Sequence, residues 1–193
     1  MGAAKTESPD WTALYATAET QAGFFTTAQA HAAGFSLPLL HKYLKNGRVI
    51  RERRGIYRLV HFPSSEHEAL VVLWLWSGQA GVFSHETALM LHELSDVLPV
   101  EAHLTVPESW CTRRLRVPAD LVLHYAAIDA TEQDWVGPVP VSGPRRTIVD
   151  CIDAHVSPEL IESAINDAHR RGLFSRRDEA ALRRRLAAAL GGT

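Results

Sequence analysis

The chain has 193 residues, which is enough for one or two compact domains. Its 46% hydrophobic and 22% charged residues are ordinary for a soluble globular protein, and the net charge of −2 excludes a chain that is basic throughout. Cys111 and Cys151 lie 40 residues apart and form no CxxC pair, so neither a zinc ribbon nor a redox pair is expected. Two lone cysteines fit a reducing cytoplasm.

The apolar stretches are too short for a membrane protein. The longest run, residues 69–76, is much shorter than the roughly 20 residues that a spanning helix needs. No apolar run follows Met1, so we expect no signal peptide. The sequence therefore predicts a cytoplasmic protein that has no membrane partner.

The first expected element is an amphipathic helix over residues 10–22. Asp10 is a residue type that favours the N-cap position. The expected apolar face consists of residues spaced three and four apart: Trp11, Leu14, Tyr15 and Ala18. Phe24 and Phe25 follow, and they suit either a short strand or a wedge in the core.

Residues 26–47 have the pattern of two helices joined by a tight turn. Two threonines precede a short Ala-rich run, residues 28–33, and Gly34 ends it. Ser36 is a second N-cap candidate, and a helix from there to Asn46 has an expected inner face of Leu37, Leu40 and Leu44. The connection of about three residues is typical of a helix-turn-helix.

Residues 48–59 predict a two-stranded hairpin. Strand-prone residues flank the expected turn at Arg53-Arg54-Gly55. A helix-turn-helix followed by such a hairpin is the winged-helix arrangement. We therefore expect residues 1–62 to form a winged helix-turn-helix domain, with a boundary near Pro63.

Basic residues are concentrated in this segment. From Ser36 to Leu59 there are seven basic residues and one acidic residue, Glu52, so this part carries +6 in a chain of −2. Positive charge gathered on one small element indicates a polyanionic partner, here double-stranded DNA, bound with strong salt dependence. The alternative is a purely structural wing whose arginines protect an exposed strand edge.

The expected DNA contacts come from the second helix and the hairpin. Side chains opposite the leucine face of that helix point away from the core and can reach bases or phosphates. Arg53 and Arg54, at the tip of the wing, are expected to enter the minor groove or to grip phosphates. The predicted DNA-binding residues are Ser36, His41, Lys42, Lys45, Arg48, Arg51, Arg53, Arg54 and Arg58.

Residues 63–193 predict a second, α+β domain, a small mixed sheet with flanking helices. It begins with a helix over residues 66–77 that is apolar on nearly every side and is therefore buried. Residues 129–137 are expected to form an acidic connector. Further helices are expected to begin at Ser84, Ser142, Ser157 and Ser175, and strands are expected at residues 101–106, 121–128 and 139–141.

The sequence gives little support for catalysis or for a metal. His85 and His92 lie seven apart, unlike the HExxH spacing, although His103 and His124 lie on different expected strands that can be neighbours. There is no GxSxG elbow, no phosphate-binding loop and no lysine after Lys45. We therefore expect no enzyme, no catalytic residue, no metal and no cofactor.

Two arginines near the start of a later helix leave two interpretations open. Arg146 precedes Asp150 by four residues, which suits an ion pair on the helix surface. Alternatively, Arg145 and Arg146 provide secondary contacts to DNA or to a protein partner.

Five segments, in this order, are similar to the AbiEi family, antitoxins of type IV toxin–antitoxin systems that also act as transcriptional regulators. The resemblance implies that the winged-helix domain binds inverted repeats in the promoter of its own operon and represses it. It also implies that residues 63–193 counteract a cognate nucleotidyltransferase-type toxin. The segments are FTTAQA (25–30), RRGIYR (53–58), FSHETAL (83–89), LTVP (104–107) and GPRRTIVD (143–150).

The same resemblance implies a DNA-contacting role for Ser36, Lys42, Lys45 and the wing arginines, and it assigns no catalytic residue. Related chains often continue into a restriction-endonuclease-like domain, which we expect to be absent because this chain stops at Thr193. A stand-alone winged-helix regulator, whose α+β domain senses a ligand or dimerises, is the alternative.

Overall fold

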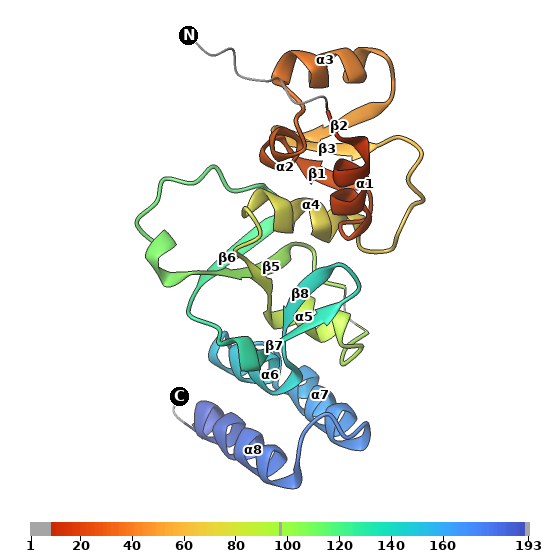
Figure 1. The fold of residues 1–193 in the computed structure, drawn as a ribbon. Coiled ribbons are helices and arrows are strands. Elements are labelled where there is room, and N and C mark those ends of the chain that lie inside the picture. The colour runs from red at the N-terminus through yellow and green to blue at the C-terminus, as the bar shows by residue number, and fades with distance from the viewer. Residues whose placement is uncertain (1–8, 97, 192–193) are drawn as a thin grey trace. The chain divides into compact units, whose positions relative to one another are not determined.

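The computed structural model describes residues 9–96 and 98–191, and these fall into two compact units (Figure 1). The first unit comprises Met1–Gln79 with Gly137–Val139, and the second comprises Ala80–Val136 with Pro140–Thr193. The first unit extends beyond Pro63 because the apolar helix α4 (Glu68–Trp76) packs against two of its strands. No helix among the described residues is long and apolar enough to cross a membrane.

The first unit is a winged helix-turn-helix, as predicted. Three antiparallel strands pair in the order β1-β3-β2, and Figure 1 shows α1, α2 and α3 around this small sheet. The elements, in chain order, are α1 (Trp11–Glu19), β1 (Phe24–Thr26), α2 (Thr27–Ala32), α3 (Leu37–Lys45), β2 (Val49–Arg53), β3 (Ile56–Leu59) and α4.

Local hydrogen bonds begin all three of the first helices. The amides of Thr12 and Ala13 donate to Oδ1 of Asp10 at 2.9 and 3.0 Å. Thr26 and Gln29 form a reciprocal capping box, in which each side chain accepts from the other's amide. The hydroxyl of Ser36 accepts from the amide of Leu39 at 3.4 Å. These caps satisfy amides that the helices leave without a partner.

Two apolar residues lie outside the core, contrary to expectation. Tyr15 is 51% exposed and Leu37 is 54% exposed. The inner face of α3 is rotated from the predicted one because it includes Tyr43. The Tyr43 ring packs edge-on against the Trp11 ring, with 4.8 Å between ring centres. The buried core of this unit consists of Leu14, Ala18, Phe25, Ala30, Phe35, Leu40, Val49, Tyr57 and Leu59.

The second unit is α+β, as predicted, with a mixed sheet of order β6-β5-β4-β8-β7. The strands β4 and β5 are antiparallel, whereas β4–β8 and β5–β6 are parallel. The elements are β4 (Val82–Phe83), α5 (His85–Leu91), β5 (Ala102–Val106), η1 (Glu108–Trp110), β6 (Leu121–Tyr125), η2 (Ala130–Glu132), β7 (Gln133–Val136), β8 (Val139–Ser142), α6 (Pro144–Asp153), α7 (Pro158–Arg170) and α8 (Arg176–Gly191).

Residues 129–137, expected to be an acidic connector, include a strand that was not predicted. This segment contains the 3-10 turn η2 and the edge strand β7, which is joined to β8 through Gly137 at φ +55°. Asp134 and Trp135 of β7 are exposed, so the strand lacks the apolar alternation by which a half-buried strand is recognised.

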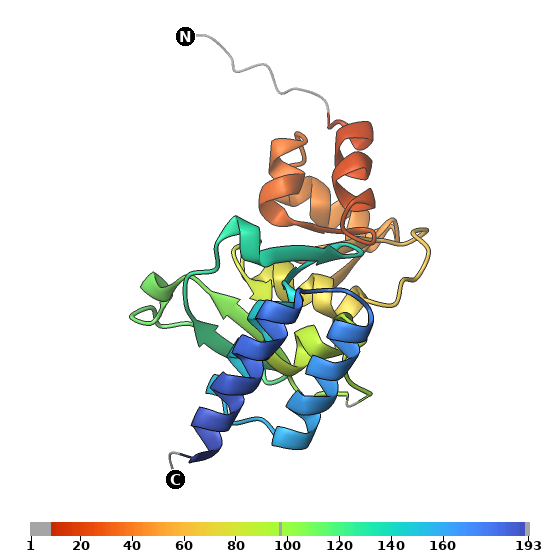
Figure 2. The same cartoon turned by 90° about the horizontal axis from the view of Figure 1, so that it is seen from below.

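Helix α6 is central to the core of the second unit. It packs against α5, α7 and α8, and Figure 2 shows α7 and α8 side by side in blue. The buried cluster consists of Leu89, Leu94, Ile148, Cys151, Ile152, Ile161, Ala164, Ile165, Ala168, Leu182 and Leu186. Burial raises the pKa of the Cys151 thiol, so it is packed in its neutral form.

Candidate nucleic-acid interface

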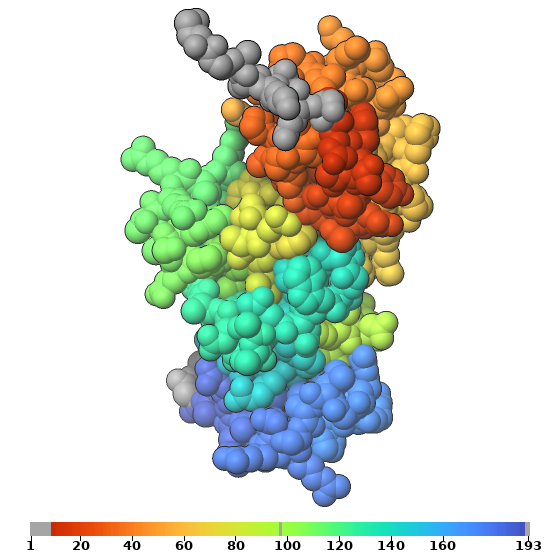
Figure 3. Space-filling model, viewed as in Figure 1, coloured from red at the N-terminus to blue at the C-terminus, as the bar shows by residue number. Residues whose placement is uncertain are grey.

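Helix α3 exposes one continuous face. Leu39, Leu40, Tyr43 and Leu44 pack against the core. Since successive residues are about 100° apart on a helix, the remaining positions share an outward arc of about 140°. That outward face consists of Leu37, Pro38, His41, Lys42 and Lys45, and the segment, in orange in Figure 3, lies at the surface of the first unit. The predicted orientation of His41 and the two lysines is confirmed.

The wing is a tight hairpin with an irregular outer strand. The register of β2 against β3 shifts between Arg51 and Arg53, which is a β-bulge, and the turn is Arg54-Gly55 with Gly55 at φ +80°. A bulge re-aims the side chains around it. Arg51 and Arg54 are exposed, while Arg53 is half-buried.

The structure thus leaves seven of the nine predicted DNA-binding residues exposed on α3 and the wing. Within the described part of the chain, no carboxylate forms an ion pair with the basic side chains among them. Arg48 follows α3 in the chain, and its guanidinium lies 5.7 Å from the centre of the Tyr43 ring. The exposed residues are Ser36, His41, Lys42, Lys45, Arg48, Arg51 and Arg54.

Arg58 differs from the other predicted contacts. Its guanidinium pairs with the Glu68 carboxylate, donates to the carbonyl oxygen of Phe62 at 3.3 Å, and lies 5.4 Å from the centre of the Phe24 ring. A half-buried arginine held in this way joins the wing strand β3 to α4. We propose that Arg58 serves packing within the first unit rather than the predicted DNA contact.

The secondary contacts predicted in the second unit are also engaged internally. Arg146 donates to Asp150 and to Glu132, each at 2.8 Å, and this confirms the ion pair that the four-residue spacing indicated. Burial is the first cause of the raised pKa of Asp150, which the Arg146 guanidinium opposes. Arg145 is exposed but lies 3.3 Å from Asp178. Neither arginine is therefore a free cation.

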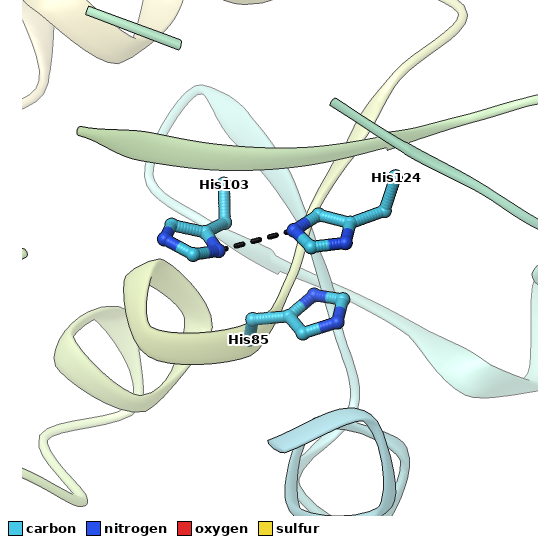
Figure 4. A group of neighbouring side chains, drawn as sticks. All are labelled: His85, His103 and His124. Atoms are coloured by element: carbon cyan, nitrogen blue, oxygen red, sulfur yellow. Dashed lines mark hydrogen bonds between the residues drawn. The ribbon is translucent and has the colours of Figure 1, made fainter. Parts of the chain in front are cut away.

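Three histidines that sequence reasoning did not group together meet in the second unit. His85 begins α5, whereas His103 and His124 lie on β5 and β6, and one ring nitrogen from each lies within 4.8 Å of the others (Figure 4). Burial, and then the neighbouring His124 and His103, lowers the pKa of His85 to about 3. Burial likewise lowers the pKa of His124 to about 4, so these rings are neutral at pH 7. Only the expected closeness of the two strands carrying His103 and His124 pointed to this cluster.

The fold and exposed face of the first unit define a winged helix-turn-helix domain, the class in which a second helix and a hairpin are presented together. Residues 13–60, which contain nearly all of it, match the family described as "Transcriptional regulator, AbiEi antitoxin". The resemblance to the AbiEi family is confirmed over this segment.

The remaining comparisons add a structural likeness. The crystal structure of the RV2827C protein from Mycobacterium tuberculosis is 14% identical, with a TM-score of 0.45, over 90% of this chain and 79% of that one. No curated protein matches the sequence.

Proposed function

We propose that the protein is an antitoxin that represses its own operon by binding inverted repeats in promoter DNA. Helix α3 docks in the major groove, and the β2–β3 wing lies against the neighbouring backbone. The interface comprises Ser36, His41, Lys42, Lys45, Arg48, Arg51 and Arg54, with Arg53 at its edge.

The observation that supports this proposal is a difference between the two units in how basic side chains are paired with carboxylates. Five exposed basic side chains, Lys42, Lys45, Arg48, Arg51 and Arg54, have no carboxylate partner within the described residues, whereas Arg146 and Arg185 of the second unit lie in close ion pairs. Unpaired cations on one face release counterions from DNA when they neutralise phosphates. The exposed Leu37 adds an apolar group of the kind that contacts a thymine methyl.

Binding to a duplex taken from upstream of the gene, measured by fluorescence anisotropy at several salt concentrations, tests the interface. The double variant Lys42→Ala/Lys45→Ala should bind more weakly, and its slope of log affinity against log salt should flatten by about 1 for each phosphate contact removed. The matched control is Arg184→Ala on α8, which removes another exposed cation. An unchanged slope in the double variant would remove α3 from the interface.

The antitoxin activity is proposed for residues 63–193, against a nucleotidyltransferase-type toxin encoded beside this gene. Co-expression should relieve the growth arrest that the toxin causes. Because the two activities use different surfaces, Lys42→Ala/Lys45→Ala should lose repression of a promoter reporter and still rescue growth. Failure of the unaltered protein to rescue growth would leave a stand-alone regulator.

A further inference from the structure

The histidine cluster belongs to the second unit and shares no residue with the proposed DNA contacts. Three different elements contribute to it: the first residue of α5 and one residue from each of two adjacent parallel strands. Nδ1 of His103 lies 3.1 Å from Nε2 of His124, and the rings of His85 and His124 are stacked at 3.6 Å between centres. Figure 4 shows the three side chains converging from their separate elements.

We propose that His85, His103 and His124 bind a divalent transition-metal ion, for which Zn²⁺ is the best match. Imidazole nitrogen is a preferred ligand of zinc, and three histidines with a fourth position open to water are a known zinc donor set. With zinc–nitrogen bonds of about 2.0–2.1 Å, ligand nitrogens in a tetrahedral site lie about 3.3 Å apart. The separation of 3.1 Å between His103 and His124 is already close to this value.

The groups around the histidines are arranged to hold the imidazole rings in place. Oε2 of Glu86 lies 3.4 Å from Nε2 of His103, which leaves Nδ1 facing the cluster. A carboxylate on the far nitrogen of a ligating histidine fixes the ring and strengthens it as a ligand. The Thr105 hydroxyl donates to Oγ of Ser84, which in turn lies 2.8 Å from Nδ1 of His85.

The backbone at His85 is a further sign that the position is specialised. His85 is a non-glycine residue at φ +52° at the start of α5, a conformation that L residues adopt at a cost of about 1–2 kcal/mol. This conformation sets the imidazole under the two strand histidines. An ion shared by α5, β5 and β6 therefore links a helix to the sheet and stabilises the second unit.

The test uses the full chain, free of any affinity tag and stripped with a chelator. Titration with Co²⁺ should produce the visible absorption of a site with nitrogen ligands, and Zn²⁺ should displace it at one ion per chain. Zn²⁺ should also raise the melting temperature, because it binds only the folded state. In His124→Gln the affinity should fall at least 100-fold, while the exposed His61→Gln should bind as the unaltered chain does.

A second variant tests the site without removing a ligand, so that loss of binding cannot be confused with loss of folding. Glu86→Gln keeps all three imidazoles, and it should weaken Zn²⁺ binding about 10-fold, as loss of an outer carboxylate does, with an unchanged circular dichroism spectrum. Absence of a Co²⁺ band in the folded, unaltered chain would overturn the proposal. Equal affinities of His124→Gln and His61→Gln would overturn it as well.

Discussion

The amide of Thr27 donates to the carbonyl oxygen of Gly55 at 2.9 Å, and the Thr27 hydroxyl lies 3.3 Å from the same oxygen. The first residue of helix α2 is thereby bound to the turn of the wing, 28 residues further along the chain. This contact positions the wing relative to the helix-turn-helix. The turn that carries the exposed Arg54 is thus held against the start of the helix-turn-helix.

We expect Thr27→Val to loosen the wing. The hydrogen bond from the backbone amide to Gly55 remains, but the hydroxyl is lost. The free energy of unfolding should therefore fall by only about 0.5–1.5 kcal/mol. If the wing position matters for the proposed DNA contacts, affinity should fall by more than this small loss of folded protein explains. Urea unfolding and anisotropy on the same samples check this, with Thr27→Ser as the control that keeps the hydroxyl.

Gly23→Ala should severely destabilise the first unit. Gly23 has φ +85°, and a Cβ there would lie 2.5 Å from Cβ of Phe62, closer than any real contact. Both the backbone and the packing are therefore strained, and we expect a loss of more than about 2 kcal/mol. Gly47→Ala is the matched control, because Gly47 has φ +66° but open space around it. Thermal melts should show a loss of about 1 kcal/mol there, and equal losses would contradict the packing argument.

Arg58→Met should affect stability rather than the salt dependence of DNA binding. The variant leaves the half-buried Glu68 carboxylate without its guanidinium partner, which should cost about 1–3 kcal/mol in unfolding free energy. The exposed Arg54→Met should behave in the opposite way, with stability nearly unchanged and a flatter salt slope. A flattened slope in Arg58→Met at full stability would restore Arg58 to the interface.

Stability should fall as the pH drops below about 6.5, in part through His92. Burial lowers the pKa of His92, and the nearby Arg171 lowers it further. Two groups raise it: the carbonyl oxygen of Ser142, 2.7 Å from Nε2 of His92, and the Asp134 carboxylate. The net result is a lowered pKa. Because the folded pKa lies below the unfolded one, the unfolded chain binds more protons in this window. The stabilising contribution of His92 is fully present above pH 6.5 and is lost as the pH falls through the pKa of His92 in the folded protein.

Through His92, the free energy of unfolding should fall by up to about 1.4 kcal/mol over the first pH unit below 6.5. Urea unfolding at pH 7.5, 6.5 and 5.5 measures it. His92→Gln, which can keep a hydrogen bond to Ser142, should show a smaller loss than the unaltered chain, and the exposed His61→Gln should show the same loss. A steeper acid loss in His92→Gln would reverse the sign of our argument.

Sequence reasoning was most successful where the information is local. The caps at Asp10, Thr26 and Ser36 and the spacing of apolar residues predicted the helices of the first unit, because these signals act within about one or two turns of the chain. It was least successful for β7, whose exposed residues carry no apolar alternation. The strand exists because β8 offers it a partner, and such pairing is not a property of the segment itself.

The sequence by itself determined the order of helices and strands, the charge of α3 and the wing, and the family resemblance. Only the tertiary structure decided which of those charges are free. Arg58 and Arg54 are alike in sequence, yet only Arg58 meets a carboxylate from α4. The three histidines likewise meet only because β5 and β6 pair in one register beside the start of α5. Local patterns fix what each segment can form, whereas a side chain's partner depends on which distant segments pack together.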